Sequence, residues 1–299
     1  MQHINSVLVI GNGFDLDLGL KTHFKDFFSS NEYHKLQPYI EIPGSLAEYL
    51  SNQYKLNHWF DVEEAMASYV KEKEKSKDFN CVLADKYFLN ELKSAFWDYV
   101  CHEVLNIASK QSLAKELIKK QNRDKCFDKI YSFNCFDCTQ YDFASWGEIE
   151  NLNNVVYVHN YLDKFILGVS NYDSKDNNYS FLQKNHQQGY PVSDIEKFKE
   201  DLLNADNVVI FGHSLNRIDM VYFKDLFWHI SQSHCVKKNI FFITKDNQSA
   251  KIIKDNISDH AILFSVLESS CNISFIYTEK CKSIKDVENF ESILNIKNR

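Results

Sequence analysis

Two glycines near the amino terminus have a spacing that suits phosphate binding. They lie in Gly11-Asn12-Gly13-Phe14-Asp15, directly after the apolar run 6–10. Glycines at the end of a strand let backbone N–H groups approach a phosphate without interference from a Cβ atom. The segment is not a G-x-G-x-x-G fingerprint, because Leu16 stands at the third glycine position. It therefore predicts either a nucleotide site or a tight strand-to-helix turn without a ligand.

Two more polar side chains follow a second apolar run, 127–133. These are Asn134 and Asp137, and ligands of parallel sheets bind beyond the carboxyl ends of the strands. Asn134 could hydrogen-bond a ribose or hold a water molecule. Asp137 could cap a helix or act on a substrate. The alternative is that both residues only complete a turn.

A histidine, His159, closes the run 155–159. Histidine ordinarily titrates near pH 6.5, about where a general base is most useful. The position at a strand end favours a role at a site, and a structural role is the alternative.

A further glycine segment, Gly212-His213-Ser214, closes the run 207–212 and precedes a helical pattern. Gly212 and Ser214 would let a ribose or a phosphate reach the N-terminus of that helix, where N–H groups are unpaired. Asn216 and Asp219 have the spacing of a capping pair, which is the alternative to ligand contact.

Short apolar runs alternate with helical patterns, which predicts an α/β fold with a parallel sheet covered on both faces. Only 8 Gly and 3 Pro interrupt the 299 residues, which favours long helices. Helical patterns after the first run predict a large insertion at about 30–125 within a single domain, 1–299. The predicted strands are 6–10, 127–133, 155–159, 165–169, 207–212, 239–244 and 273–277.

Local signals place the ends of several helices. Thr22 is expected to cap a helix that runs through Phe24, and Asp61 and Glu64 have capping-box spacing. Residues 81–108 read as one long amphipathic helix. The polar stretch 170–190 is the best candidate for a mobile loop.

Composition excludes several classes of partner. A formal net charge of -7 makes nucleic acid an unlikely partner. No apolar run reaches the roughly 18 residues of a membrane span, so we expect no membrane association. Eight irregularly spaced cysteines without a signal peptide indicate a cytoplasmic protein. The pair Cys135 and Cys138 has no second pair at zinc-site spacing, so no metal is expected.

Taken in order, these motifs resemble the AbiH family of bacteriophage abortive-infection proteins. The opening matches the family pattern G-N-G-F-D-x-x-x-G-L-x-T-x-[YF]-x-D-F. The other matching segments are Trp59-Phe60-Asp61-Val62-Glu63, Phe133-Asn134-Cys135-Phe136-Asp137, Val158-His159-Asn160 and Phe211 to Asp219. The resemblance spans most of residues 6–225 and implies a role in phage defence.

More distantly, the chain is similar to the sirtuin-type NAD-binding fold, which implies a parallel Rossmann-like sheet and NAD as substrate or ligand. By this likeness Asn134 would hold the nicotinamide-side ribose or a water, and His159 would be the base. The residues expected to bind the nucleotide are Gly11, Asn12, Gly13, Phe14, Gly212, His213, Ser214 and Asp219.

Two departures from the sirtuin pattern limit the likeness. Asn134 and Asp137 are three residues apart rather than two, and Asn160 replaces a glycine after His159. The chain also has no four-cysteine pattern for the sirtuin zinc ribbon, so deacylation is not expected.

Three functions remain open at this level. The first is NAD hydrolysis by Asn134 and His159, with Asp15 or Asp137 stabilising developing positive charge. The second is a nucleotide-sensing module that acts through a partner defence protein, or as a homo-oligomer, with the helical insertion as partner surface. The third is a metal-dependent nuclease that uses Asp15, Asp17, Asp61, Glu63 and His159.

Overall fold

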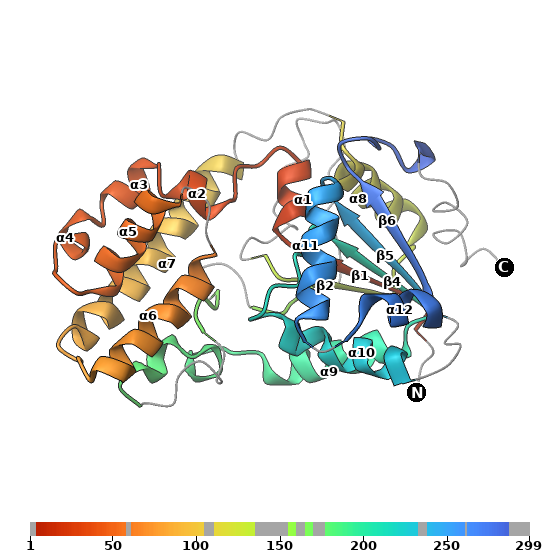
Figure 1. Cartoon of the computed structure of the whole chain (residues 1–299). Coiled ribbons are helices and arrows are strands. Elements are labelled where there is room, and N and C mark those ends of the chain that lie inside the picture. Colours follow the sequence, from red (N-terminus) through yellow and green to blue (C-terminus); the bar gives the residue numbers. More distant parts are fainter. Residues whose placement is uncertain are drawn as a thin grey trace. The chain divides into compact units, whose positions relative to one another are not determined.

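The computed structural model describes residues 4–57, 61–104, 111–134, 155–159, 165–169, 177–232, 238–260 and 262–286. Its contacts divide the chain into two compact units, which are treated separately below (Figure 1). The single domain predicted over residues 1–299 stays a prediction. The first unit comprises Met1–Leu20, Ile107–Val158 and Ser193–Arg299, and the second comprises Lys21–Asn106 and His159–Val192.

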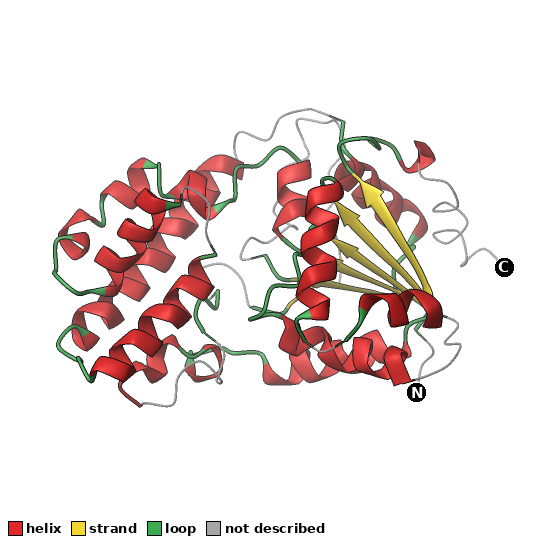
Figure 2. Ribbon diagram, in the orientation of Figure 1, coloured by secondary structure: helices red, strands yellow, loops and turns green. Residues whose placement is uncertain are grey.

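A sheet of six parallel strands forms the centre of the first unit (Figure 2). The order across the sheet is β3-β2-β1-β4-β5-β6, so the direction of strand addition reverses between β1 and β4. The predicted parallel Rossmann-like α/β fold is confirmed. The strands are β1 (Ser6–Ile10), β2 (Lys129–Ser132), β3 (Val155–Tyr157), β4 (Asn207–Phe211), β5 (Asn239–Thr244) and β6 (Asn272–Tyr277).

The strand β1 lies in the middle of this sheet, and its register aligns the ends of its neighbours. Ile10 at the end of β1 pairs with Ser132 on β2 and with Phe211 on β4. All residues of β1 and β4 are buried, which explains why both read as continuous apolar runs. The residues that follow the three strands therefore emerge at one edge of the sheet.

Helices flank this sheet, as expected when parallel strands are joined by crossover connections. None of the helices in the described part of the chain combines the length and apolar composition needed to cross a membrane. The helices of this unit are α1 (Asn12–Asp17), α8 (Leu113–Asp124), α9 (Val192–Asn204), α10 (Met220–Gln232), α11 (Asn247–Ser258), α12 (Phe264–Ser270) and the 3₁₀ turn η6 (Ile284–Asp286).

The second unit is helical, whereas α8, the last helix within the predicted insertion at about 30–125, belongs to the first unit. The expected helix at 81–108 is α7 (Val82–Val104), and Asp61 is the N-cap of α6 as predicted. The other elements are α2 (Phe24–Phe27), α3 (Asn31–His34), α4 (Gln37–Ile40), α5 (Leu46–Leu56), α6 (Val62–Ser76), η4 (Asn177–Leu182) and η5 (Lys184–His186).

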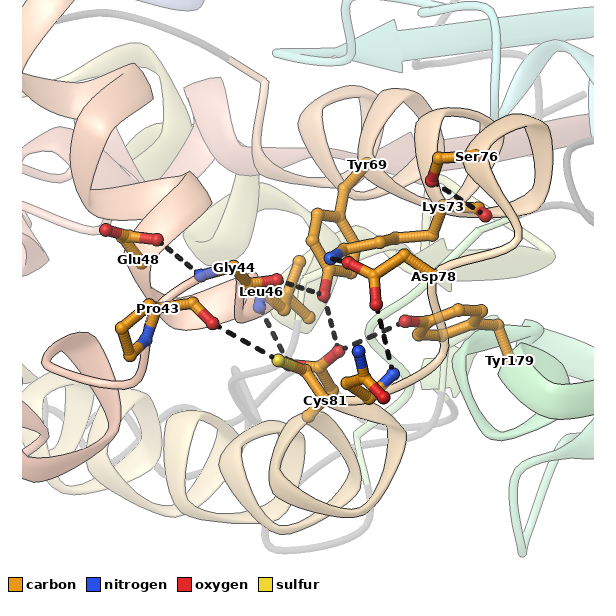
Figure 3. Close-up of polar contacts among 12 residues, drawn as sticks. Pro43, Gly44, Leu46, Glu48, Tyr69, Lys73, Ser76, Asp78, Cys81 and Tyr179 are labelled. Carbon is orange, nitrogen blue, oxygen red and sulfur yellow. Dashed lines mark hydrogen bonds and ion pairs between the residues drawn. The ribbon is translucent and has the colours of Figure 1, made fainter.

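The fully buried carboxylate of Asp85 on α7 connects four elements of this unit by hydrogen bonds. It accepts hydrogen bonds from the Leu46 amide (2.7 Å), the Tyr69 hydroxyl (2.6 Å) and the Tyr179 hydroxyl (3.5 Å). Figure 3 shows the three donors converging from α5, α6 and η4. Burial raises the pKa of Asp85, although the hydrogen bonds from Tyr69 and Leu46 act in the opposite direction.

Two predictions about local structure are wrong. Residues 165–169 are not a strand, because their one strand-like contact is an isolated bridge between Val169 and Gln183. Their amides bond instead to groups such as the Glu63 carboxylate, which accepts from Gly168. Thr22 does not cap α2, since the N-cap is His23 and no side chain makes the capping hydrogen bond.

Candidate functional site

Three segments that are far apart in the sequence meet at the carboxyl edge of β2, β1 and β4. Asn134 follows β2, Gly11 follows β1, and Gly212 follows β4. In open parallel sheets, ligands bind outside the carboxyl ends of the strands where the strand order reverses. These three predicted positions therefore converge at the point of the sheet where a ligand is expected.

The two glycine turns at this edge are in direct backbone contact. A Cβ atom on Gly13 would lie 2.6 Å from the Cα of Gly212, and one on Gly11 would lie 2.7 Å from the Cα of His213. Gly212 itself has a φ of +67°, a conformation that favours glycine. The glycines are thus required by the packing of the two turns on each other.

The amides of the first turn are bonded within the protein. Gly11 N–H donates to the Phe211 carbonyl (2.8 Å), Gly13 N–H to the Gly212 carbonyl (2.8 Å), and Phe14 N–H to the Gly11 carbonyl (2.9 Å). The Phe14 ring is fully buried against Phe211, with ring centroids 5.0 Å apart. A phosphate bound here would have to use groups other than these three amides.

The side chain of Asn134 is buried at the end of β2 and held from two sides. Its Nδ2 donates to the Gly11 carbonyl (3.3 Å), and its backbone N–H donates to the Ser132 hydroxyl (3.2 Å). Within the described residues, no donor contacts Asn134 Oδ1. An amide oxygen in this position is suited to accept a hydrogen bond from a ligand hydroxyl.

His213 forms a structural pair with Asp219. Its Nδ1 accepts a hydrogen bond from the Leu215 amide (3.0 Å), and its Nε2 lies 3.5 Å from Asp219 Oδ2. The ring packs against Phe133, with centroids 4.5 Å apart. The capping alternative is confirmed in part, because Asn216 Oδ1 accepts from the Asp219 amide (2.8 Å). Ser214, by contrast, is exposed.

Of the two aspartates on α1, Asp15 is buried, at 2% exposure. Asp17 accepts from the Ala114 amide (2.9 Å) at the start of α8, and its other oxygen lies 3.9 Å from Lys282 Nζ. Asp17 therefore helps to position a helix. Asp137, with Cys135 and Cys138, lies outside the described residues.

The second unit contains His159 together with a residue that the sequence analysis missed. Lys184 Nζ lies 2.7 Å from Glu63 Oε2 and 3.4 Å from His159 Nε2. The polar stretch 170–190 was expected to be a loop, yet Lys184 lies in its turn η5 and is buried. The apolar residues Tyr179 and Leu182, both fully buried, are the signal in the sequence that this stretch packs inside.

The carboxylates of the W-x-D-x-E segment have separate tasks. Asp61 Oδ1 accepts from the amides of Glu63 (2.9 Å) and Glu64 (3.0 Å), so it caps α6. Glu63 binds Lys184 and the Gly168 amide (3.0 Å). Among the residues that the structure describes, no three His, Cys, Asp or Glu side chains are grouped to hold a metal ion.

Comparison with known proteins identifies one family. Residues 7–244 match the family model described as "Bacteriophage abortive infection AbiH". Searches of curated proteins and of solved structures gave no significant match. The matched range includes β2 to β5, β1 from its second residue onward, and both glycine turns.

Proposed function

The chain belongs to the AbiH family of bacteriophage abortive-infection proteins, and on this basis we propose that it binds a nucleotide at the carboxyl ends of β1, β2 and β4. NAD is the first ligand to test. The convergence of Gly11, Asn134 and Gly212 where the strand order reverses carries this proposal. A nucleotide would enable the protein to sense or to alter the state of an infected cell.

Asn134 is the residue proposed to recognise the ligand. Its Nδ2 is fixed by the Gly11 carbonyl (3.3 Å), so the orientation of the amide is set before a ligand arrives. Its Oδ1 would then accept a hydrogen bond from a ribose hydroxyl. A side chain that is held in advance loses little entropy on binding, which favours affinity.

The proposed reaction is hydrolysis of the nicotinamide–ribose bond of NAD. Water adds its oxygen to the ribose C1′ as the bond to nicotinamide breaks, which yields nicotinamide, ADP-ribose and a proton. The transition state resembles an oxocarbenium ion, as in glycoside hydrolysis. Asn134 would orient the ribose, and the buried carboxyl group of Asp15 is the group proposed to stabilise the positive charge.

The test is to titrate the purified protein with NAD by calorimetry and to separate the products by chromatography. Asn134→Ala is the test variant, and Asn239→Ala is its matched control. Asn239 is also an asparagine of the sheet whose Nδ2 donates to a protein oxygen, Asn207 Oδ1 (2.8 Å), but it lies at the amino end of β5. We expect the first variant to lose binding by about tenfold or more and the control to keep it. Equal affinity in both variants would contradict the proposal.

A nucleotide-sensing module without turnover is the second candidate. Polar groups at this edge are engaged by other protein groups, which leaves fewer of them to act on a substrate. Both ring nitrogens of His213 contact protein groups. Three amides of the first turn are likewise hydrogen-bonded within the protein. Tight binding of NAD or ADP-ribose without release of nicotinamide would select this function over hydrolysis.

A further inference from the structure

Three ionisable side chains form a buried line in the second unit. Glu63 comes from α6, Lys184 from η5, and His159 lies a few residues before the segment 165–169. The side chain of Lys184 is 4% exposed and that of Glu63 is 13% exposed, while His159 as a whole is 7% exposed. Lys184 lies in the middle, 2.7 Å from the carboxylate and 3.4 Å from the imidazole.

The charges on the pair follow from its burial. A lone ammonium in the protein interior is unfavourable, and a carboxylate in contact with it stabilises the charged form. The Glu63 carboxylate is stabilised in turn, because its second oxygen accepts the Gly168 amide (3.0 Å). Lys184 is therefore a cation and Glu63 an anion at neutral pH.

The state of the imidazole follows from the chemistry of lysine. An ammonium group has N–H donors and no lone pair, so it can only donate. His159 Nε2, at 3.4 Å from Lys184 Nζ, must then be the acceptor. A neutral imidazole carries one proton, which leaves it on Nδ1. Protonating Nε2 as well would remove this hydrogen bond and set two cations against each other.

We propose that Lys184, held by Glu63, is a positioning residue that keeps His159 neutral with its proton on Nδ1. In the part of the chain that the structure describes, Lys184 contacts the ring directly and Glu63 acts on it through Lys184. His159 then acts as an N–H donor through Nδ1, whereas a base acting through Nε2 would first have to displace Lys184. The position of the proton on His159 does not depend on the proposed function.

The direct test is NMR of the full chain labelled with ¹⁵N-histidine. Long-range proton–nitrogen spectra distinguish the two neutral tautomers and the charged ring, and His159→Gln assigns the signals. We expect the Nδ1–H form at pH 7. An Nε2–H form, or a charged ring at that pH, would overturn the proposal without any further variant.

Lys184→Met tests the cause. Without the ammonium, we expect the titration midpoint of His159 to rise by about one pH unit or more. Lys73→Met is the matched control, because Lys73 is also a buried lysine of this unit, paired with Asp78 at 2.6 Å. An unchanged midpoint in a folded Lys184→Met protein would contradict the role of Lys184. If that variant does not fold, the spectrum of the wild type still shows which ring nitrogen of His159 carries the proton, and an Nε2–H form would overturn the proposal.

The outcomes separate this inference from the proposed function. Failure of the protein to bind or hydrolyse NAD leaves the tautomer measurement unaffected. Conversely, NAD hydrolysis with His159 in the Nε2–H form would support the proposed function and reject the positioning role of Lys184.

Discussion

Gly13 and Gly212 touch through their backbones at the ends of two neighbouring strands. The Gly13 amide donates to the Gly212 carbonyl over 2.8 Å, and a Cβ on Gly212 would lie 2.4 Å from the Cα of Gly13. The two turns thus pack as one structure at the edge where the nucleotide is proposed to bind. Their glycines are explained by this contact even before any ligand is considered.

Replacing Gly212 should destabilise the protein strongly. Gly212→Ala combines a positive φ with a clash against backbone that cannot move aside. Gly44→Ala is the control: φ there is +73°, but the nearest atom to a Cβ is the flexible Lys73 Nζ at 3.4 Å. We expect the control to cost about 1–2 kcal/mol and Gly212→Ala at least about 2 kcal/mol more. Urea unfolding measures both, and equal losses would show that the contact is unimportant.

The buried pair Glu63 and Lys184 should be strongly coupled. Removing one side chain deprives the other buried charge of its oppositely charged contact, so Glu63→Gln and Lys184→Met should each cost about 3–5 kcal/mol. The double variant should cost clearly less than the sum. Lys254 and Glu268, an exposed pair at 3.2 Å, provide the control cycle, with coupling below about 1 kcal/mol. Additive losses at Glu63 and Lys184 would refute a buried ion pair.

Lys238 should make the stability depend on pH. It is buried, donates to the carbonyls of Leu202, Leu203 and Ala205, and burial lowers its pKa to about 8. Between pH 8 and the ordinary lysine value of about 10.4, the unfolded chain holds a proton that the folded chain has lost. The free energy of unfolding of the wild type, relative to Lys238→Met, therefore rises with pH in this window.

Urea unfolding at several pH values from 7.5 to 10 checks this slope. Lys251→Met removes an exposed lysine of α11 and should keep the wild-type dependence on pH. A difference between wild type and Lys238→Met that stays constant across the range would mean that Lys238 remains charged in the folded protein.

The sequence by itself determined the strands of the sheet and the strand ends at which the candidate site residues lie. Six of seven predicted apolar runs are strands. β1 and β4 are buried along their whole length, and a strand buried on both faces needs apolar residues without alternation. Asp61 caps α6 as its spacing indicated, because capping is a local interaction. The ends of β1, β2 and β4 could be identified from the ends of these apolar runs, although no local pattern indicates that the three strands are neighbours.

Tertiary structure decided the rest, because long-range contacts leave little trace in local patterns. Residues 165–169 look like a strand, but their amides bond to partners such as Glu63, which is 105 residues away from Gly168. Lys184 lies in a stretch that the sequence predicted to be a polar loop, but in the structure it contacts Glu63 and His159. The strand order and the contact between Gly13 and Gly212 arise in the same way, from pairing of segments that are distant in the chain.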